Sequence, residues 1–100
     1  MIRFIEKRPY SAPVFNEVDV KTISDLENHL GNHFTQYNMG SGLYLLIKTT
    51  EDYEEPNIVV DEKAISGTVY VIRAAHTKLL SVIDEDITNF KAAVRFIEFF

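Results

Sequence analysis

The feature that most constrains the fold is a series of short β-rich runs on both sides of one helix signal. Five runs rich in Val, Ile, Leu, Tyr and Phe lie near residues 2–5, 14–20, 43–48, 58–60 and 68–72. These residue types pack well on a pleated sheet. With the helix after the second run, they predict one α+β domain in the order β-β-α-β-β-β.

The first helix is predicted to begin near Thr22. Thr22 and Ser24 each stand three residues before an acidic residue, as in a capping box. Apolar residues then recur at helical spacing as far as Tyr37, and the turn at residues 40–42 (Gly-Ser-Gly) ends the segment. We therefore expect a helix from Thr22 past Tyr37 to this turn.

A second helix is predicted from Ile87 to the end of the chain. The acidic residues 84–86 lie where a helix N-terminus favours negative charge. Phe96, Phe99 and Phe100 fall outside a single core-facing stripe, so the apolar sector is about twice as wide as one stripe. This helix is expected to bury a second side against something else.

The composition excludes several classes of function. The chain has no cysteine, which excludes disulfides, thiolate catalysis and cysteine-bound metals. Its net charge of −5 would repel nucleic acid and anionic lipid, so neither is an expected partner. Residues 1–8 lack the apolar stretch of a signal peptide, and no run of about 18 apolar residues suggests a membrane span. A cytoplasmic location is the expectation.

No motif in the sequence indicates catalysis. His29 and His33 lie four residues apart, but they lack the Glu of a metalloprotease motif and are interpreted as surface or half-buried side chains. The acidic loop around residues 51–55 lacks the glycine of a calcium loop. The Gly-Ser-Gly segment at residues 40–42 precedes a strand, so the amide cradle of a phosphate site is missing. We expect no enzyme activity, no cofactor and no metal.

The strand at residues 43–48 is apolar on both faces, so one face could remain uncovered by the first helix. If Leu45 faces that helix, its neighbours Tyr44 and Leu46 point away from it. In one of two registers Tyr70 joins them, and such an aromatic patch is typical of a protein interface. Alternatively, the second helix covers this face and makes a three-layer monomer. The expected interface residues are Tyr44, Leu46, Tyr70, Phe96, Phe99 and Phe100.

Several segments together resemble a known family. Val20-Lys21-Thr22 closes the opening hairpin, and residues 23–30 follow as a helix with a leucine at its end. A segment that begins with Phe34 then leads into the Gly-aromatic strand of residues 42–47, and residues 67–75 form a strand that begins with glycine. In this order, the span from residue 2 to about residue 75 resembles the N-terminal domain of lambda-type phage tail assembly protein I. The element order is that of the β-grasp, or ubiquitin-like, fold.

The resemblance implies a β-grasp domain at residues 1–76, with a mixed sheet packed on one helix, and a helical extension at residues 77–100. Members of the family continue into a long Gly/Ala-rich region, whereas this chain continues into a charged, phenylalanine-rich helix. A terminal Gly-Gly is absent, so conjugation of the ubiquitin kind is not expected.

Two functions follow as expectations. The first is a non-enzymatic protein-binding module, a phage tail assembly or structural component that docks on tail-tip proteins and could form homo-oligomers. The second is a small acidic phage protein that inhibits a host defence enzyme through residues 51–55 or 84–86. Either would place the protein in the host cytoplasm or the virion.

Overall fold

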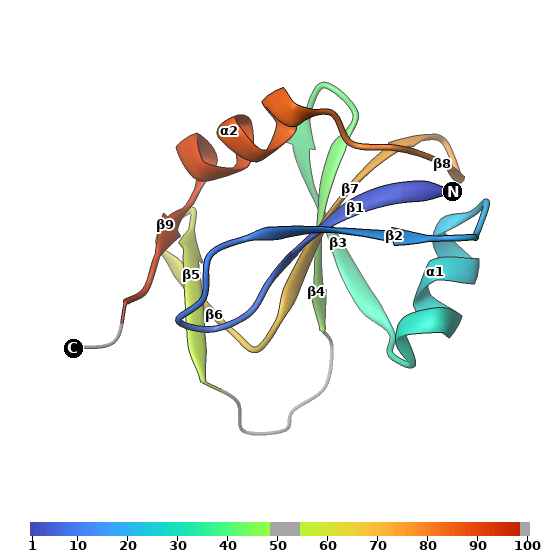
Figure 1. Cartoon of the computed structure of the whole chain (residues 1–100). Coiled ribbons are helices and arrows are strands. Elements are labelled where there is room, and N and C mark those ends of the chain that lie inside the picture. Colours follow the sequence, from blue (N-terminus) through green and yellow to red (C-terminus); the bar gives the residue numbers. More distant parts are fainter. Residues whose placement is uncertain (49–54, 99–100) are drawn as a thin grey trace.

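The computed structural model describes residues 1–48 and 55–98, which form an α+β fold with two antiparallel sheets and two helices (Figure 1). The predicted α+β class is confirmed. The elements are β1 (Ile2–Lys7), β2 (Val14–Val18), α1 (Ile23–Leu30), β3 (Phe34–Gly40), β4 (Leu43–Lys48), β5 (Pro56–Val60), β6 (Lys63–Ser66), β7 (Val69–Ala75), β8 (Lys78–Leu80), α2 (Asp84–Ala93) and β9 (Arg95–Phe96).

The larger sheet has the order β2-β1-β7-β4-β3, and β8 pairs with the end of β7. The predicted opening hairpin is confirmed, with Ile2 opposite Val18. In the central pair, Lys7 at the end of β1 lies opposite Val69 at the start of β7. The strand pairs of the described residues are all antiparallel, so the expected mixed sheet is wrong. The reason is that the chain leaves the β5–β6 hairpin beside the end of β1. Strand β7 starts there and therefore runs antiparallel to β1.

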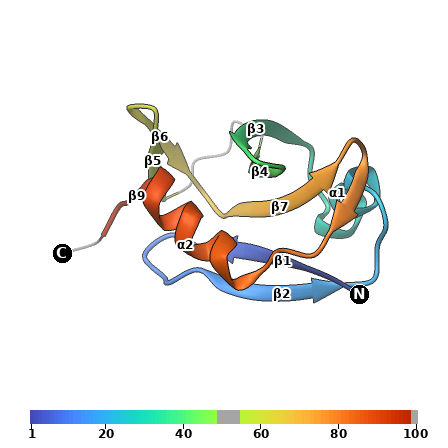
Figure 2. The same cartoon turned by 90° about the horizontal axis from the view of Figure 1, so that it is seen from above.

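The smaller sheet has the order β6-β5-β9 and lies at the opposite end of the long strands from α1 (Figure 2). Its hairpin turns at Asp61 and Glu62, which both have positive φ, of 47° and 66°. This backbone matches the type I′ turn that joins two-residue hairpins. On the other side of β5, Phe96 of β9 pairs with Ile58.

Helix α1 is shorter than predicted. It begins as expected, because the Thr22 hydroxyl accepts a hydrogen bond from Asp25 N at 3.1 Å. It ends at Leu30, because Gly31 takes a left-handed conformation with φ of 75° and its N–H bonds to Glu27 O. Residues 34–40, predicted as helix, instead form β3 and pair with β4 across the turn at residues 41–42.

Helix α2 starts and ends earlier than predicted. It begins at Asp84, so residues 84–86 form its first turn, as their charge suggested. It ends at Ala93, where Val94 adopts an extended backbone. Phe96 therefore lies on β9 and not on a helix, which corrects the sequence prediction.

Both faces of the central strands are covered. Leu45 and Val71 pack with Phe90 of α2 in one core cluster. On the other face, Leu46 packs with Leu26 of α1 in a second cluster. The described part of the C-terminal region thus packs within the same molecule, in the three-layer arrangement that was the alternative to an open sheet face.

We predict that Gly31→Ala lowers the free energy of unfolding by about 1 kcal/mol, because a Cβ is disfavoured in the left-handed conformation. Nothing lies within 4 Å of an added Cβ, so the effect arises from backbone strain and not from a clash. Gly31→Asn is the control, since Asn tolerates this conformation. Urea unfolding measures both, and equal losses would contradict the assigned helix end.

Candidate functional site

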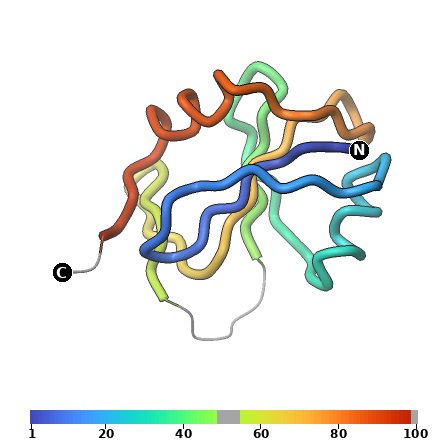
Figure 3. The backbone as a smooth tube through the Cα atoms, viewed as in Figure 1, coloured from blue at the N-terminus to red at the C-terminus, as the bar shows by residue number. Residues whose placement is uncertain are grey.

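A cleft of about 590 Å³ lies between the β1–β2 turn and the C-terminal segment. Residues 10–13 of the turn form one side, and residues 96–98 form the other. Lys7 of β1 and Lys91 of α2 complete the lining. Figures 2 and 3 show the β1–β2 turn beside the C-terminal segment, at the end of the molecule away from the N-terminus. We call this hollow the cleft.

Local sequence explains one side of the cleft, and contacts between remote segments hold the other. Pro9 and Pro13 lack a backbone N–H, so the chain between β1 and β2 leaves the ladder and turns, with Ser11 N donating to Arg8 O at 3.3 Å. Tyr10 within it has φ of 59° and is 40% exposed. The opposite side is held by β9 and by Ile97 N, which donates to Asn57 O at 2.8 Å.

Lys7 is a buried cation beside the cleft, with 1% exposure. Its ammonium donates to Arg8 O and to Asn57 Oδ1, both at 2.7 Å, and lies 4.9 Å from the centre of the Phe96 ring. These partners are neutral, and none of the ion pairs among the described residues includes Lys7. Desolvation lowers the pKa of the Lys7 ammonium below its ordinary value of 10.5.

Asn57 joins the two sheets under the cleft. Its side chain is fully buried, and its Nδ2 donates to Lys7 O and Gly67 O, each at 2.7 Å. Its Oδ1 accepts from the Lys7 ammonium, and its backbone oxygen holds Ile97. One residue of β5 thereby fixes the end of β1, the entry to β7 and one wall of the cleft.

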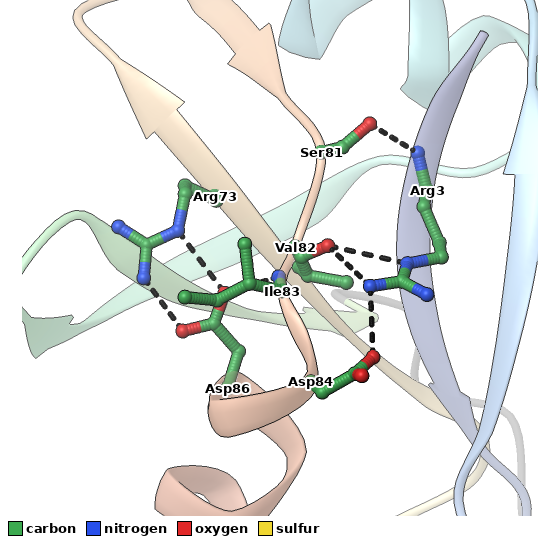
Figure 4. A network of polar contacts seen from close by, with 7 residues as sticks. All are labelled: Arg3, Arg73, Ser81, Val82, Ile83, Asp84 and Asp86. Atoms are coloured by element: carbon green, nitrogen blue, oxygen red, sulfur yellow. Dashed lines mark hydrogen bonds and ion pairs between the residues drawn. The ribbon is translucent and has the colours of Figure 1, made fainter.

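A second polar network fixes α2 against the large sheet (Figure 4). Arg73 of β7 donates to both oxygens of the buried Asp86 carboxylate, at 2.6 and 3.1 Å. The same carboxylate accepts from Ile83 N at 2.9 Å. Nearby, Arg3 donates to Val82 O and to Asp84, at 3.0 and 3.2 Å. The network holds the start of α2, while Lys91 reaches the cleft from its last turn.

The charges of this network explain one pKa shift. Burial by itself would raise the pKa of the Asp86 carboxyl. The hydrogen bonds from Arg73 and from Ile83 N, together with the charges of Arg73 and Arg3, outweigh burial and lower this pKa below its ordinary 3.8. Asp86 is therefore ionised at neutral pH and engaged within the molecule.

The structure separates the predicted interface residues. Leu46 and Tyr70 are 0% and 9% exposed, and Tyr44 is half-buried against the same cluster, so the expected open patch is wrong. Its physical cause is that α1 packs on this face, whereas α2 and β5 cover the other. Phe96 is half-buried at the cleft, and its interface role stays a prediction. Phe99 and Phe100 lie outside the described residues.

The two predicted acidic segments differ in their surroundings. Asp86 points inward, and Asp84 bonds to Arg3, so residues 84–86 act as the start of a helix. In the acidic loop, Glu55 is exposed and accepts a hydrogen bond from the Tyr10 hydroxyl at 3.1 Å. Residues 51–54 lie outside the described part of the chain.

The two histidines do not share a helix face, because His29 lies on α1 and His33 lies beyond its end. Among residues 1–48 and 55–98, no group of three potential metal ligands occurs. The helices described there are too short to cross a membrane.

Sequence reasoning missed Lys7 and Asn57. One signal was available for Lys7, since alternation along β1 places it on the same face as the buried Ile5. Asn57 carries no comparable signal, because its partners come from segments remote in the sequence.

Comparisons with protein-family models, with curated proteins and with solved structures found no match to this chain.

We predict that Asn57→Ala lowers the free energy of unfolding by about 3 kcal/mol or more, since each buried group left without a partner costs about 1–3 kcal/mol. Lys7 O and Gly67 O lose the bonds from the Asn57 amide, and the Lys7 ammonium loses one of its two hydrogen bonds and keeps the one to Arg8 O. Asn38→Ala is the control, because it removes one exposed hydrogen bond to Gly40 N. Urea denaturation compares the two, and a similar small loss for both would show that the buried joint is not as described.

The Arg73–Asp86 pair makes stability pH-dependent. Because the folded-state pKa of Asp86 lies below its unfolded value, its contribution is fully present above pH 3.8 and is lost as pH falls through the folded-state pKa. We predict that Asp86→Ala lowers the free energy of unfolding by about 3–5 kcal/mol at neutral pH. The variant should also lose less stability than the unmodified protein when the pH is lowered. Asp84→Ala, at a side chain that is 89% exposed, should cost about 1 kcal/mol or less. Chemical unfolding at pH 7 and in acid gives both quantities, and the prediction fails if the two variants behave alike.

Proposed function

We propose that this chain is a non-catalytic protein-binding module that contacts its partner through the cleft. The observation that carries the proposal is the composition of the cleft walls. Tyr10 and Pro13 on one side face the C-terminal segment with Phe96 and Ile97 on the other, and charged side chains stand beside them. Aromatic residues in a hollow with polar surroundings are typical of the energetic centre of protein interfaces.

The contact surface differs from the one that the sequence predicted. Leu46 and Tyr70 lie in the core, so the proposal moves the interface to the end of the molecule where β9 and the β1–β2 turn meet. Phe96 belongs to both versions. Its ring packs against Phe90 at 5.6 Å between centroids, which holds it at the cleft wall.

For the biological setting, we propose a phage tail assembly or structural role. The resemblance of residues 2–75 to the N-terminal domain of lambda-type phage tail assembly protein I supports it. The β-grasp assignment belongs to the same proposal, supported by an opening hairpin followed by a helix, with β7 between β1 and β4. The antiparallel β1–β7 pair departs from the mixed sheet of that fold, so the cleft and not the fold carries the binding proposal.

The inhibitor hypothesis needs exposed carboxylates that can dock on a basic groove. In residues 84–86, Asp86 is buried and paired with Arg73, and the exposed Asp84 pairs with Arg3. Glu85 is then the exposed carboxylate of this segment that lies outside the described ion pairs. We therefore place the tail component first.

We predict that Tyr10→Ala weakens association with tail-tip proteins encoded beside this chain by about tenfold, since tyrosines at interface centres often contribute more than 1 kcal/mol. Leu80→Ala on β8 is a matched control, because Leu80 is also 40% exposed but lies outside the cleft. Sedimentation of purified mixtures measures the association. Circular dichroism checks that both variants stay folded.

Three results would count against this proposal. One is that none of these tail-tip proteins associates with the chain, and another is equal loss in the two variants. The third is binding to a defence enzyme that disappears steeply with added salt, which would favour the inhibitor.

A further inference from the structure

We propose that the cleft binds a segment of a partner protein in which an acidic side chain lies beside an apolar one. This inference rests on the proposed function and names the chemistry of the partner. The net charge of the cleft lining is positive, whereas the net charge of the whole chain is negative.

The cleft lining carries two cations and one anion, Lys7, Lys91 and Glu98, within a chain of net charge −5. A basic hollow on an acidic molecule attracts negative groups locally. Two further acidic side chains contact residues next to the lining or in it and have partners there, since Glu6 pairs with Arg8 and Glu55 accepts from Tyr10. In the part of the chain that the structure describes, the cleft lining therefore carries one more positive than negative charge, and this positive charge is available to a ligand.

The Lys7 ammonium is the part of this positive charge that is buried. Its hydrogen-bond partners, Arg8 O and Asn57 Oδ1, satisfy its geometry but leave its charge unneutralised. Burial of an ammonium without an opposite charge costs free energy, and the lowered pKa of Lys7 has this cause. A carboxylate in the cleft would interact with this charge more strongly than in bulk water, because the surroundings have a lower dielectric constant.

The apolar residues that line the cleft indicate that the ligand also carries an apolar side chain. The Phe96 ring lies 4.9 Å from the Lys7 ammonium and lines the cleft together with Tyr10 and Pro13. An aromatic or aliphatic side chain fits between these walls, and the hydroxyl of Ser11 adds a hydrogen-bonding group. Peptide segments that join one acidic and one apolar residue offer both features at once.

The test uses two synthetic peptides with the full chain, acetyl-Gly-Phe-Glu-Phe-Gly-amide and the same peptide with Gln in place of Glu. We expect the acidic peptide to shift the amide resonances of residues 10–12 and 96–98 in ¹⁵N-labelled protein. It should bind about five- to tenfold more tightly than the Gln peptide, and added salt should reduce the difference. Bound acidic peptide should also raise the pKa of Lys7, measured from its side-chain resonances.

Three charge variants localise the effect. Lys91→Met should weaken binding of the acidic peptide about two- to fivefold, the range of a partly exposed ion pair. Glu98→Gln should strengthen it by a similar factor, because a like charge is removed from the cleft. Lys63→Met is the control, since Lys63 is exposed on β6 outside the cleft and its loss should change nothing.

Equal affinity for the two peptides, shifts confined to other surfaces, or no shift at millimolar peptide would each overturn the inference. An unchanged affinity in Lys91→Met together with Glu98→Gln would do the same. If tail-tip proteins still bind in a Tyr10-dependent way, the proposed function survives that failure. If the acidic peptide binds as expected but no tail-tip protein does, the cleft chemistry stands and the tail role fails.

Discussion

The structure depends on the buried contact between Lys7 and Asn57. The large and the small sheet share no strand, so their relative position needs a connection that is more specific than apolar packing. Asn57 provides it by donating to Lys7 O and Gly67 O while its oxygen accepts from the Lys7 ammonium. All these groups are buried, so each bond would be costly to lose. Because Ile97 also bonds to Asn57, the joint positions the C-terminal wall of the cleft as well.

The need to bury apolar side chains explains why the described structure has no open sheet face. β4 and β7 are apolar on both sides, and a two-sided strand needs cover on both. Helix α1 packs on one side of these strands, and α2 and β5 pack on the other. The Arg73–Asp86 pair fixes α2 there, since its first turn cannot move outward without breaking the two hydrogen bonds from Arg73 to the Asp86 carboxylate.

Local signals in the sequence predicted the parts of the fold that local chemistry determines. The Thr22 cap and the strands predicted at residues 43–48 and 68–72, which are observed as β4 and β7, are of this kind. Residues 34–40 were assigned wrongly because Phe34 and Tyr37 fit helical spacing, whereas pairing with β4 and the left-handed Gly31 decide for a strand. The site was least predictable, because its floor is made by contacts between β1 and β5 that are fifty residues apart.

The buried Lys7 ammonium takes part both in the contact that stabilises the fold and in the proposed binding site. The Lys7 ammonium interacts with Asn57, which holds the sheets, and with Phe96, which lines the cleft. A negative group that enters the cleft therefore offsets part of the burial cost of this ammonium in the free protein. Since such a ligand binds only the folded chain, it also raises the apparent stability of the joint in proportion to its occupancy. The position of the charge thus couples a bound partner to the packing of the two sheets.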